Sequence, residues 1–403
     1  MKKYIISLCG LALLWTTGCK KTVIEQITQI TRDTSIVKLP EYVITDYGAI
    51  ADGKTDCGPV INKIINIMPA SGGTIIIPIG DFLVNTTINV NKSFITISGL
   101  NTGLRSNVDV PVSGLTAPGG GSKLILGTAT SAITVPLLPQ VNGSTNRVSG
   151  LEIKNLLISG GATSHGIGIN ILQDNDGTRI DNVVGINLTM GLYANASDAM
   201  IINSCWISEC QNSINLANGI QNTITDCQLG AQPGGITVKL DNQQNFSFTG
   251  NQVYPDGNVN LQLNNSTYGN ISSNNFQSYY VGVIELNSSD YNIINDNIFW
   301  MRIPSDPTKQ LRGNTNDYGV LRIAGNGNLI SSNSITCDWV SPTTNPVTIN
   351  SLSGTSNTYD DLKISDISSS RVFDVDETTQ IVNCVPASKV FVNGDAANVF
   401  INY

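Results

Sequence analysis

The sequence is poor in charge and has almost no histidine. Only 13% of its 403 residues are charged, and His165 is the single histidine. The formal net charge is −8, and Lys and Arg form no basic stripe. A nucleic-acid-binding surface needs clustered cations to neutralise phosphates, so the composition argues against that function. An acidic surface also suits a neutral polysaccharide better than a polyanionic one.

Cysteine motifs for metals are missing as well. The eight cysteines include no CxxC pair and no zinc spacing. Cys9 and Cys19 lie in the N-terminal segment described next. Cys205 and Cys227 share one slot of the repeat described below, which predicts buried free thiols there.

Long apolar runs are absent, and the N-terminus holds a short one. Lys2 and Lys3 precede the apolar stretch 4–15, which is too short to span a bilayer and leads into TTGC. This pattern resembles a bacterial lipoprotein signal over 1–19, with Cys19 lipidated; an ordinary cleaved signal is the alternative. We therefore expect a tether over 20–40 and a lipid-anchored cell-envelope protein of the outer membrane or periplasm.

An internal repeat is the most informative feature. The frame apolar-x-x-(Cys/Asn)-x-apolar recurs with its central residue at Cys205, Cys227, Asn251, Asn274, Asn297 and Asn333, at spacings of 22, 24, 23, 23 and 36. The units hold β-branched residues, Gly and Asn, and no helical period. Short strands and turns in a fixed register of about 23 residues predict an all-β, single-stranded, right-handed parallel β-helix over 41–403. The central asparagines should form an inward hydrogen-bonded ladder.

The start of this domain predicts a capping helix. Asp56 is the expected N-cap, with an apolar face at Ile61, Ile64, Ile65 and Met68, and Gly72 and Gly73 should end the helix. A buried strand, TIIIP, follows. The DYGA-ADG-TD and GG-III-P-G patterns of this segment resemble pectate-lyase-like β-helix proteins, a superfamily that hosts several chemistries.

Two carboxylates stand out in ASDAMIINSCWISEC (196–210). Asp198 and Glu209 lie eleven positions apart and flank the stack-filling residues. Paired carboxylates with different roles suit glycosyl transfer, because one protonates the leaving oxygen and the other accepts a proton or attacks. Solvated turn residues are the plain alternative.

The chain resembles the inulin fructotransferases from about residue 166 to 338, and more loosely beyond. The similar stretches are QDNDGTRI (173–180), 196–210, GAQPGGITV (230–238), NNFQSYYVG (274–282) and NDYGVLRIAGNGNLISSN (316–333). The resemblance implies that Asp198 and Glu209 are the catalytic pair and that a difructose anhydride is released from a fructan. It also implies a homotrimer with sites near subunit interfaces, and no metal or organic cofactor.

The sequence departs from this family at three places. Gly234 stands where the family has Asp, and Asp256 stands where it has Arg. The insertion 300–316 differs most and is the expected lid. These departures leave open which anhydride is formed, and whether the enzyme makes or hydrolyses it.

Several other side chains are candidates for binding sugar. Aromatic rings can stack on sugar rings, and amides and guanidinium groups can bind hydroxyls. Trp206 is either such a ring or a packing residue. The substrate-binding candidates are His165, Gln277, Tyr279, Tyr280, Trp300, Arg302, Tyr318 and Arg322.

Three rival functions remain. A difructose anhydride hydrolase would use the same scaffold. A pectate-type lyase would need a calcium-binding acid cluster, which is not evident in the sequence. A non-catalytic glycan-binding β-helix would leave Asp198 and Glu209 apart, without an aromatic-lined cleft beside them.

Overall fold

The chain divides into the units Met1–Pro40 and Glu41–Tyr403, and the fold lies in the second. The structure, a computed structural model, describes residues 39–103, 120–143, 146–161, 165–279, 282–302, 320–337, 347–366, 371–375, 380–382, 384, 390–392 and 395–396. The expected signal, lipid anchor at Cys19 and most of the tether lie outside these residues and stay predictions. In the described part, no helix is long and apolar enough to cross a membrane.

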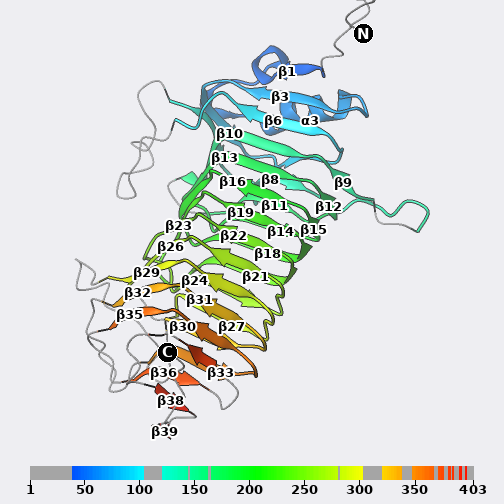
Figure 1. Cartoon of the computed structure of the whole chain (residues 1–403). Coiled ribbons are helices and arrows are strands. Elements are labelled where there is room, and N and C mark those ends of the chain that lie inside the picture. Colours follow the sequence, from blue (N-terminus) through cyan, green and yellow to red (C-terminus); the bar gives the residue numbers. More distant parts are fainter. Residues whose placement is uncertain are drawn as a thin grey trace, which may run out of the picture. The chain divides into compact units, whose positions relative to one another are not determined.

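The second unit is a parallel β-helix, as predicted. Each coil contributes strands to three rows, and each strand pairs in parallel with the equivalent strand of the next coil. Figure 1 shows the coils stacked side by side from β1 and β3 towards β33 and β36. Only the last pair, β38 with β39, is antiparallel in the part described.

The three rows comprise the following strands. The first row is β1 (Glu41–Val43), β3 (Gly73–Ile77), β6 (Ile95–Gly99), β10 (Glu152–Ser159), β13 (Arg179–Ile186), β16 (Ile201–Asn203), β19 (Thr223–Thr225), β22 (Ser247–Thr249), β25 (Asn270–Ser272), β28 (Ile293–Asn295), β31 (Leu329–Ser331), β34 (Thr358–Asp360) and β37 (Gln380–Val382). The second row is β2 (Asp52–Asp56), β4 (Gly80–Val84), β7 (Ser122–Leu126), β17 (Trp206–Cys210), β20 (Gln228–Ala231), β23 (Gln252–Val253), β26 (Asn275–Ser278), β29 (Ile298–Met301), β32 (Ser334–Cys337) and β35 (Lys363–Asp366). The third row is β5 (Ile88–Asn89), β8 (Ser131–Val135), β11 (Ile167–Ile171), β14 (Met190–Asn195), β18 (Asn212–Ile220), β21 (Ile236–Gln244), β24 (Val259–Asn264), β27 (Ile284–Asn287), β30 (Leu321–Ala324), β33 (Val347–Ser353), β36 (Arg371–Val375), β38 (Val390–Val392) and β39 (Asp395–Ala396), with the short strands β9 (Val148–Ser149), β12 (Asn175–Asp176) and β15 (Ser197–Asp198) beside it. The long strands β10 and β13 run through the first and second rows and join them into one sheet.

Two bends matter for function. We call the bend from a second-row strand to the following third-row strand the site corner, and the bend from the third row to the next first-row strand the far corner. The bends hold residues with positive φ, which favours Asn and Gly and is costly for most other side chains. Asn187 and Glu209 have this conformation at the site corner, and Asn245, Tyr268 and Tyr291 have it at the far corner.

The asparagine ladder forms as predicted. Asn251 Nδ2 donates to Asn274 Oδ1 at 3.0 Å, and Asn274 Nδ2 donates to Asn297 Oδ1 at 2.9 Å. Each amide also bonds the backbone of neighbouring coils; for example, Asn274 Nδ2 donates to Phe248 O at 2.8 Å. Because these amides are buried, they satisfy backbone groups that water cannot reach.

The two cysteine slots continue the ladder with thiols. Cys205 N donates to Cys227 Sγ at 3.4 Å, and both residues are buried free cysteines, as predicted. Burial raises the pKa of the Cys205 thiol well above its usual value, and raises that of Cys210 to about 12. These thiols are therefore packing residues that resist ionisation and oxidation.

The capping helix is present, and its expected boundaries were wrong. Helix α3 (Gly58–Ile67) has Cys57 as N-cap and ends before Met68, not at Gly72. It packs against β5 and the 3-10 helix η1 (Ile44–Tyr47), with the predicted apolar face buried. The Asp56 carboxylate accepts bonds from Gly58 N and from Thr86 Oγ1, so it ties the helix start to a turn 30 residues away.

The ladder makes Asn274 a strong determinant of stability. Asn274→Ala leaves buried partners unpaired, at about 1–3 kcal/mol for each group. We expect the free energy of unfolding, measured by urea denaturation, to fall by about 3 kcal/mol or more. Asn274→Cys should lose less, because a thiol fills the same slot at Cys227. The exposed Asn270→Ala, in the same coil, should change stability by at most about 0.5 kcal/mol. Equal losses for Asn274→Ala and Asn270→Ala would contradict the ladder's role.

Candidate functional site

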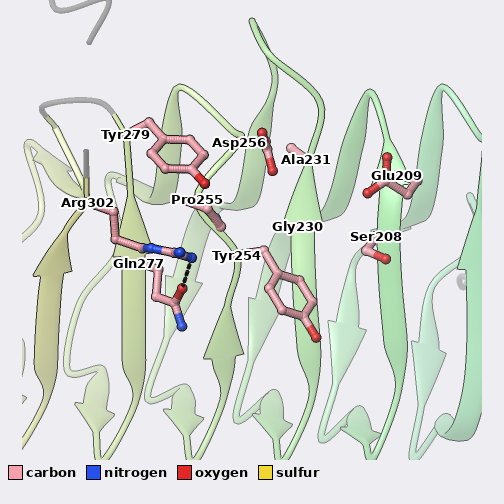
Figure 2. Close-up of a pocket in the computed structure, with 10 residues that line it drawn as sticks. All are labelled: Ser208, Glu209, Gly230, Ala231, Tyr254, Pro255, Asp256, Gln277, Tyr279 and Arg302. Atoms are coloured by element: carbon pink, nitrogen blue, oxygen red, sulfur yellow. Dashed lines mark hydrogen bonds between the residues drawn. The ribbon is translucent and has the colours of Figure 1, made fainter. Parts of the chain in front are cut away.

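A pocket lies along the site corner. It occupies about 250 Å³ and is lined by Ser208, Glu209, Gly230, Ala231, Tyr254, Pro255, Asp256, Gln277, Tyr279 and Arg302. These residues come from five successive second-row strands, β17, β20, β23, β26 and β29, and from the bends that follow them. Figure 2 shows their side chains gathered on this edge of the stack.

The repeat explains why these side chains share a face. Gln277 pairs in register with Trp300, and Tyr254 lies one coil before Gln277. Side chains alternate along a strand, so these positions point outward while their neighbours Phe276 and Phe299 fill the core. The pocket is therefore an outward column of the stack, closed on one side by the site corner.

Glu209 sits at an irregular point of the backbone. Ile207 pairs with Leu229 and Cys210 with Ala231, so the coil of Glu209 holds one more residue here than the next coil. Its φ is 53°, and the bulge turns the side chain outward at the pocket. Gln232 Nε2 donates a hydrogen bond to Glu209 Oε2. A glutamate held in this conformation carries a conformational cost, as residues at functional sites often do.

A basic and aromatic group forms the opposite end of the pocket. Arg302 Nη1 donates to Gln277 Oε1 at 3.0 Å. The guanidinium carbon lies 4.7 Å from the centre of the Trp300 ring and 5.8 Å from that of Tyr279. These contacts hold Arg302 beside the pocket, where its remaining donors suit sugar hydroxyls.

Tyr254 lines the pocket, and its ring contacts that of Trp206. Their ring centres lie 6.3 Å apart, and Tyr254 Oη donates to Gln228 Oε1 at 2.5 Å. Burial raises the pKa of Tyr254. Trp206 Nε1 donates to Ser208 Oγ, and its ring packs against a small apolar cluster that includes Val184 and Ile186. Packing is therefore one role of Trp206.

Asp198 lies elsewhere. It belongs to β15 at the far corner, where it pairs in register with Asp176 and Ile220. Its carboxylate accepts a bond from Arg147 Nη2 at 3.0 Å, and Arg147 also bonds Asp174 at 3.0 Å. Although burial opposes it, the bond with Asp174 and the charges of these aspartates raise the pKa of Arg147. Arg147 thus fixes the direction of the Asp198 carboxylate.

The two predicted catalytic carboxylates therefore do not meet within one subunit. Strands β16 and β17 separate them. The seven extended residues on this path, Ile201–Asn203 of β16 and 206–209 of β17, span on the order of 15–20 Å. Asp198 is not among the residues that line the pocket of Glu209. Their catalytic roles stay predictions.

The other predicted residues divide into three sets. Gln277, Tyr279 and Arg302 line the pocket, and Trp300 adjoins it through Arg302. His165 bonds Gly127 O at 2.6 Å in an earlier coil, and Arg322 forms an ion pair with Glu285 at 2.6 Å in the third row, so neither lines the pocket. Tyr280, Tyr318 and the expected lid after residue 302 lie outside the described residues.

Sequence reasoning missed Tyr254, Ser208, Gln232 and Arg147. The repeat held the signal for Tyr254, because steps of 23 residues connect it to Gln277 and Trp300. Arg147 had no such signal, since its contact with Asp198 joins positions 51 residues apart. In the described part, no group of three or more His, Cys, Asp or Glu side chains is placed to hold a metal ion.

Known proteins share this architecture. The family model described as "Periplasmic copper-binding protein (NosD)" matches residues 139–302. DFA-IIIase from Arthrobacter chlorophenolicus A6 without its lid superposes with a TM-score of 0.75 at 23% identity, over 89% of this chain and 99% of that one. The same enzyme in complex with DFA-III gives 0.74 at 22% identity, over 89% and 96%. The chain thus shares the parallel β-helix fold of these proteins.

Sequence similarity narrows this class. The DFA-I-forming inulin fructotransferase of Arthrobacter globiformis is 28% identical over 317 residues, which cover 72% of this chain and 79% of that protein. The predicted resemblance to the inulin fructotransferases is therefore confirmed, and so is the prediction of an enzyme.

The bulge at Glu209 predicts an unusual order of stability among its variants. Glu209→Asn and Glu209→Gln both remove the charge, and Asn adopts positive φ more readily than Gln. We expect Glu209→Asn to unfold with a free energy about 1 kcal/mol higher than Glu209→Gln. Thermal or urea denaturation of the two variants measures this difference, and a more stable Glu209→Gln would contradict backbone strain at this position.

Proposed function

We propose that the chain cleaves a fructan by intramolecular fructosyl transfer and releases a difructose anhydride. The observation that carries the proposal is Glu209, which projects from a strained bulge into a pocket with Gln277, Tyr279 and Arg302. The homology to an inulin fructotransferase supports the substrate class. The pocket's amide, guanidinium and aromatic groups suit a neutral sugar.

Glu209 is the proposed general acid. Gln232 Nε2 donates to Oε2 of its carboxyl group and holds it at the pocket, and in the proposed reaction this group carries a proton before the bond breaks. That proton passes to the oxygen of the leaving glycosidic bond. A hydroxyl of the neighbouring fructose then closes the ring on the anomeric carbon, and a carboxylate takes its proton. Because nucleophile and electrophile belong to one molecule, proximity supplies much of the rate, and exclusion of water from the pocket favours transfer over hydrolysis.

Asp198 is the proposed base, supplied by a neighbouring subunit of a homotrimer. Its side chain is more than one-third exposed at the far corner, and Arg147 holds its direction. In a closed ring of subunits, one surface of each copy meets a different surface of the next. Such a contact between the far corner of one copy and the site corner of another would complete the pair that one subunit leaves apart.

Hydrolysis of a difructose anhydride is the second candidate function. Asp256 lines the pocket with Glu209 and follows a strand two coils further along the stack. Coils repeat at about 4.8 Å, so the two positions are about 10 Å apart along the stack. This is near the roughly 6.5–9.5 Å between the carboxyl groups of inverting glycosidases, which leaves room for a water molecule. The DFA-IIIase likeness in fold is compatible with this reading.

A product assay separates the two candidates. The wild-type protein is incubated with inulin, levan and difructose anhydrides, and the products are separated by chromatography. Transfer yields an anhydride from a fructan, and hydrolysis yields an open disaccharide from an anhydride. We expect Asp198→Asn and Glu209→Gln to lower anhydride formation at least about 100-fold, with unchanged circular dichroism.

Asp256→Asn is the discriminating variant in that assay. If transfer is the main reaction, this variant keeps anhydride formation and loses only hydrolysis. Loss of both reactions would make Asp256 part of the transfer machinery. No fructose-containing product from the wild type at high enzyme loading would refute both candidates.

Mixed trimers test the shared site. Asp198→Asn and Glu209→Gln subunits, each inactive alone, are co-expressed with different tags and purified through both tags. If each site takes Asp198 from one subunit and Glu209 from the next, every mixed trimer has one intact site, and the purified mixture regains about one-third of wild-type activity. Light scattering of the wild type checks the trimer. Mixed trimers without activity would show that the two residues do not serve one site across an interface.

A further inference from the structure

One coil has an apolar outer face. Its strands β28 and β29 place Ile293, Ile298 and Trp300 on the outer face, and Tyr291 stands at the far corner just before them. All four are large, exposed hydrophobic residues, and Ile298 is 54% exposed. We call these four residues the apolar track.

Of this coil and its two neighbours, only this coil is apolar at all of the track's strand positions. At the same register, the preceding coil has Asn270, Asn275 and Gln277. The following coil has Leu329, Ser334 and Thr336. Since the two neighbouring coils hold polar residues at most of these positions, the fold does not require the track. An exposed apolar stripe of this kind marks a binding surface.

The far end of the track carries a pair of stacked tyrosines. The rings of Tyr268 and Tyr291 lie 5.5 Å apart and are inclined by 10°, and they are 61% and 53% exposed. Both residues have positive φ, at 57° and 56°. Other coils place Gln221 and Asn245 in this conformation at the far corner. Two bulky side chains here cost about 1–2 kcal/mol each, a cost without benefit to the core because the rings face solvent.

The near end of the track joins the pocket. Trp300 contacts the guanidinium group of Arg302, which lines the pocket and bonds Gln277. From Tyr291 to Trp300 the extended chain covers up to about 30 Å. A ligand chain that leaves the pocket at Trp300 can therefore follow the track over several sugar units.

The surroundings of the track are mostly polar and uncharged, apart from the exposed Asp296 in the same coil. The neighbouring outward positions of the first row, from β19 to β31, are Thr223, Thr225, Ser247, Thr249, Asn270, Ser272, Asn295, Leu329 and Ser331. Hydroxyl and amide groups beside apolar and aromatic side chains suit a chain with many hydroxyls and apolar C–H faces, and the carboxylate of Asp296 disfavours a polyanion.

We propose that the apolar track, with Tyr268, binds the body of a neutral polysaccharide whose end occupies the pocket. The inference rests on the proposed function in one respect, since the polysaccharide is then the fructan itself. The pocket sets which bond is cleaved, and the track raises the affinity for long chains over short ones.

The test replaces track residues by those that the fold uses one coil away. One variant combines Tyr268→Asn and Tyr291→Asn, following Asn245. The other combines Ile293→Asn and Ile298→Asn, following Asn270 and Asn275. Ile67→Gln, at the equally exposed end of α3, is the matched control. Affinity is measured by native electrophoresis in gels containing long-chain inulin, and kcat/KM is measured on long-chain inulin and on a short oligofructoside.

We expect each double variant to bind long-chain inulin about fivefold or more weakly, with the control unchanged. The ratio of kcat/KM on the long to the short substrate should fall by a similar factor. An unchanged ratio would overturn the proposal. A molar mass below that of the wild type, measured by light scattering, would also overturn it, because the track would then be a contact between copies of this chain.

The outcomes also separate the track from the reaction. A wild type that inulin retards through the track residues, yet forms no fructan product, would support the track and refute the proposed function. A wild type that forms the product, with both double variants unchanged in retardation, would support the reaction and refute the track.

Discussion

Register between coils is the constraint on which this structure depends. Each strand bonds the equivalent strand of the next coil, so a side chain lies above and below residues about 23 positions away. Inward columns must therefore be apolar or fully hydrogen-bonded, as at Ile202, Ile224 and Phe248 or in the asparagine ladder. Outward columns face solvent, so their side chains need be neither apolar nor fully hydrogen-bonded. The pocket is one of these columns, and its chemistry can vary from coil to coil.

The parts of the fold with a local signal were readable from sequence. Cys205 and Asn274 occupy the same buried position in their coils. The recurrence of this position revealed the period of the repeat and predicted the ladder. A second ladder through Asn292, Asn328 and Asn357 escaped notice, since other coils fill its place with different residue types. The N-cap was misjudged for a similar reason: Asp56 bonds Thr86, and its own neighbours in sequence do not reveal that turn.

The site shows the limit of spacing as a guide to geometry. A spacing of eleven positions from Asp198 to Glu209 suggested a pair, but spacing along a coil does not say which corner each residue occupies. The pocket instead gathers Glu209 with residues one to four coils away, at steps set by the stack. The repeat predicts which residues share a column of the pocket, such as Tyr254 and Gln277. It does not predict the ion pair between Arg147 and Asp198, which joins distant parts of the sequence outside the pocket.

The single extra residue at Glu209 has a consequence for how such a protein changes over evolutionary time. The register is restored at the next residue, where Cys210 pairs with Ala231, so the insertion does not alter the packing of the core. The same bend, after β29, accommodates the longer spacing between Ile294 and Ile330, which still pair directly. One edge of the stack therefore tolerates gains and losses of residues while the interior is inherited unchanged. Relatives with nearly the same backbone can therefore differ in chemistry through substitutions and insertions at that edge alone.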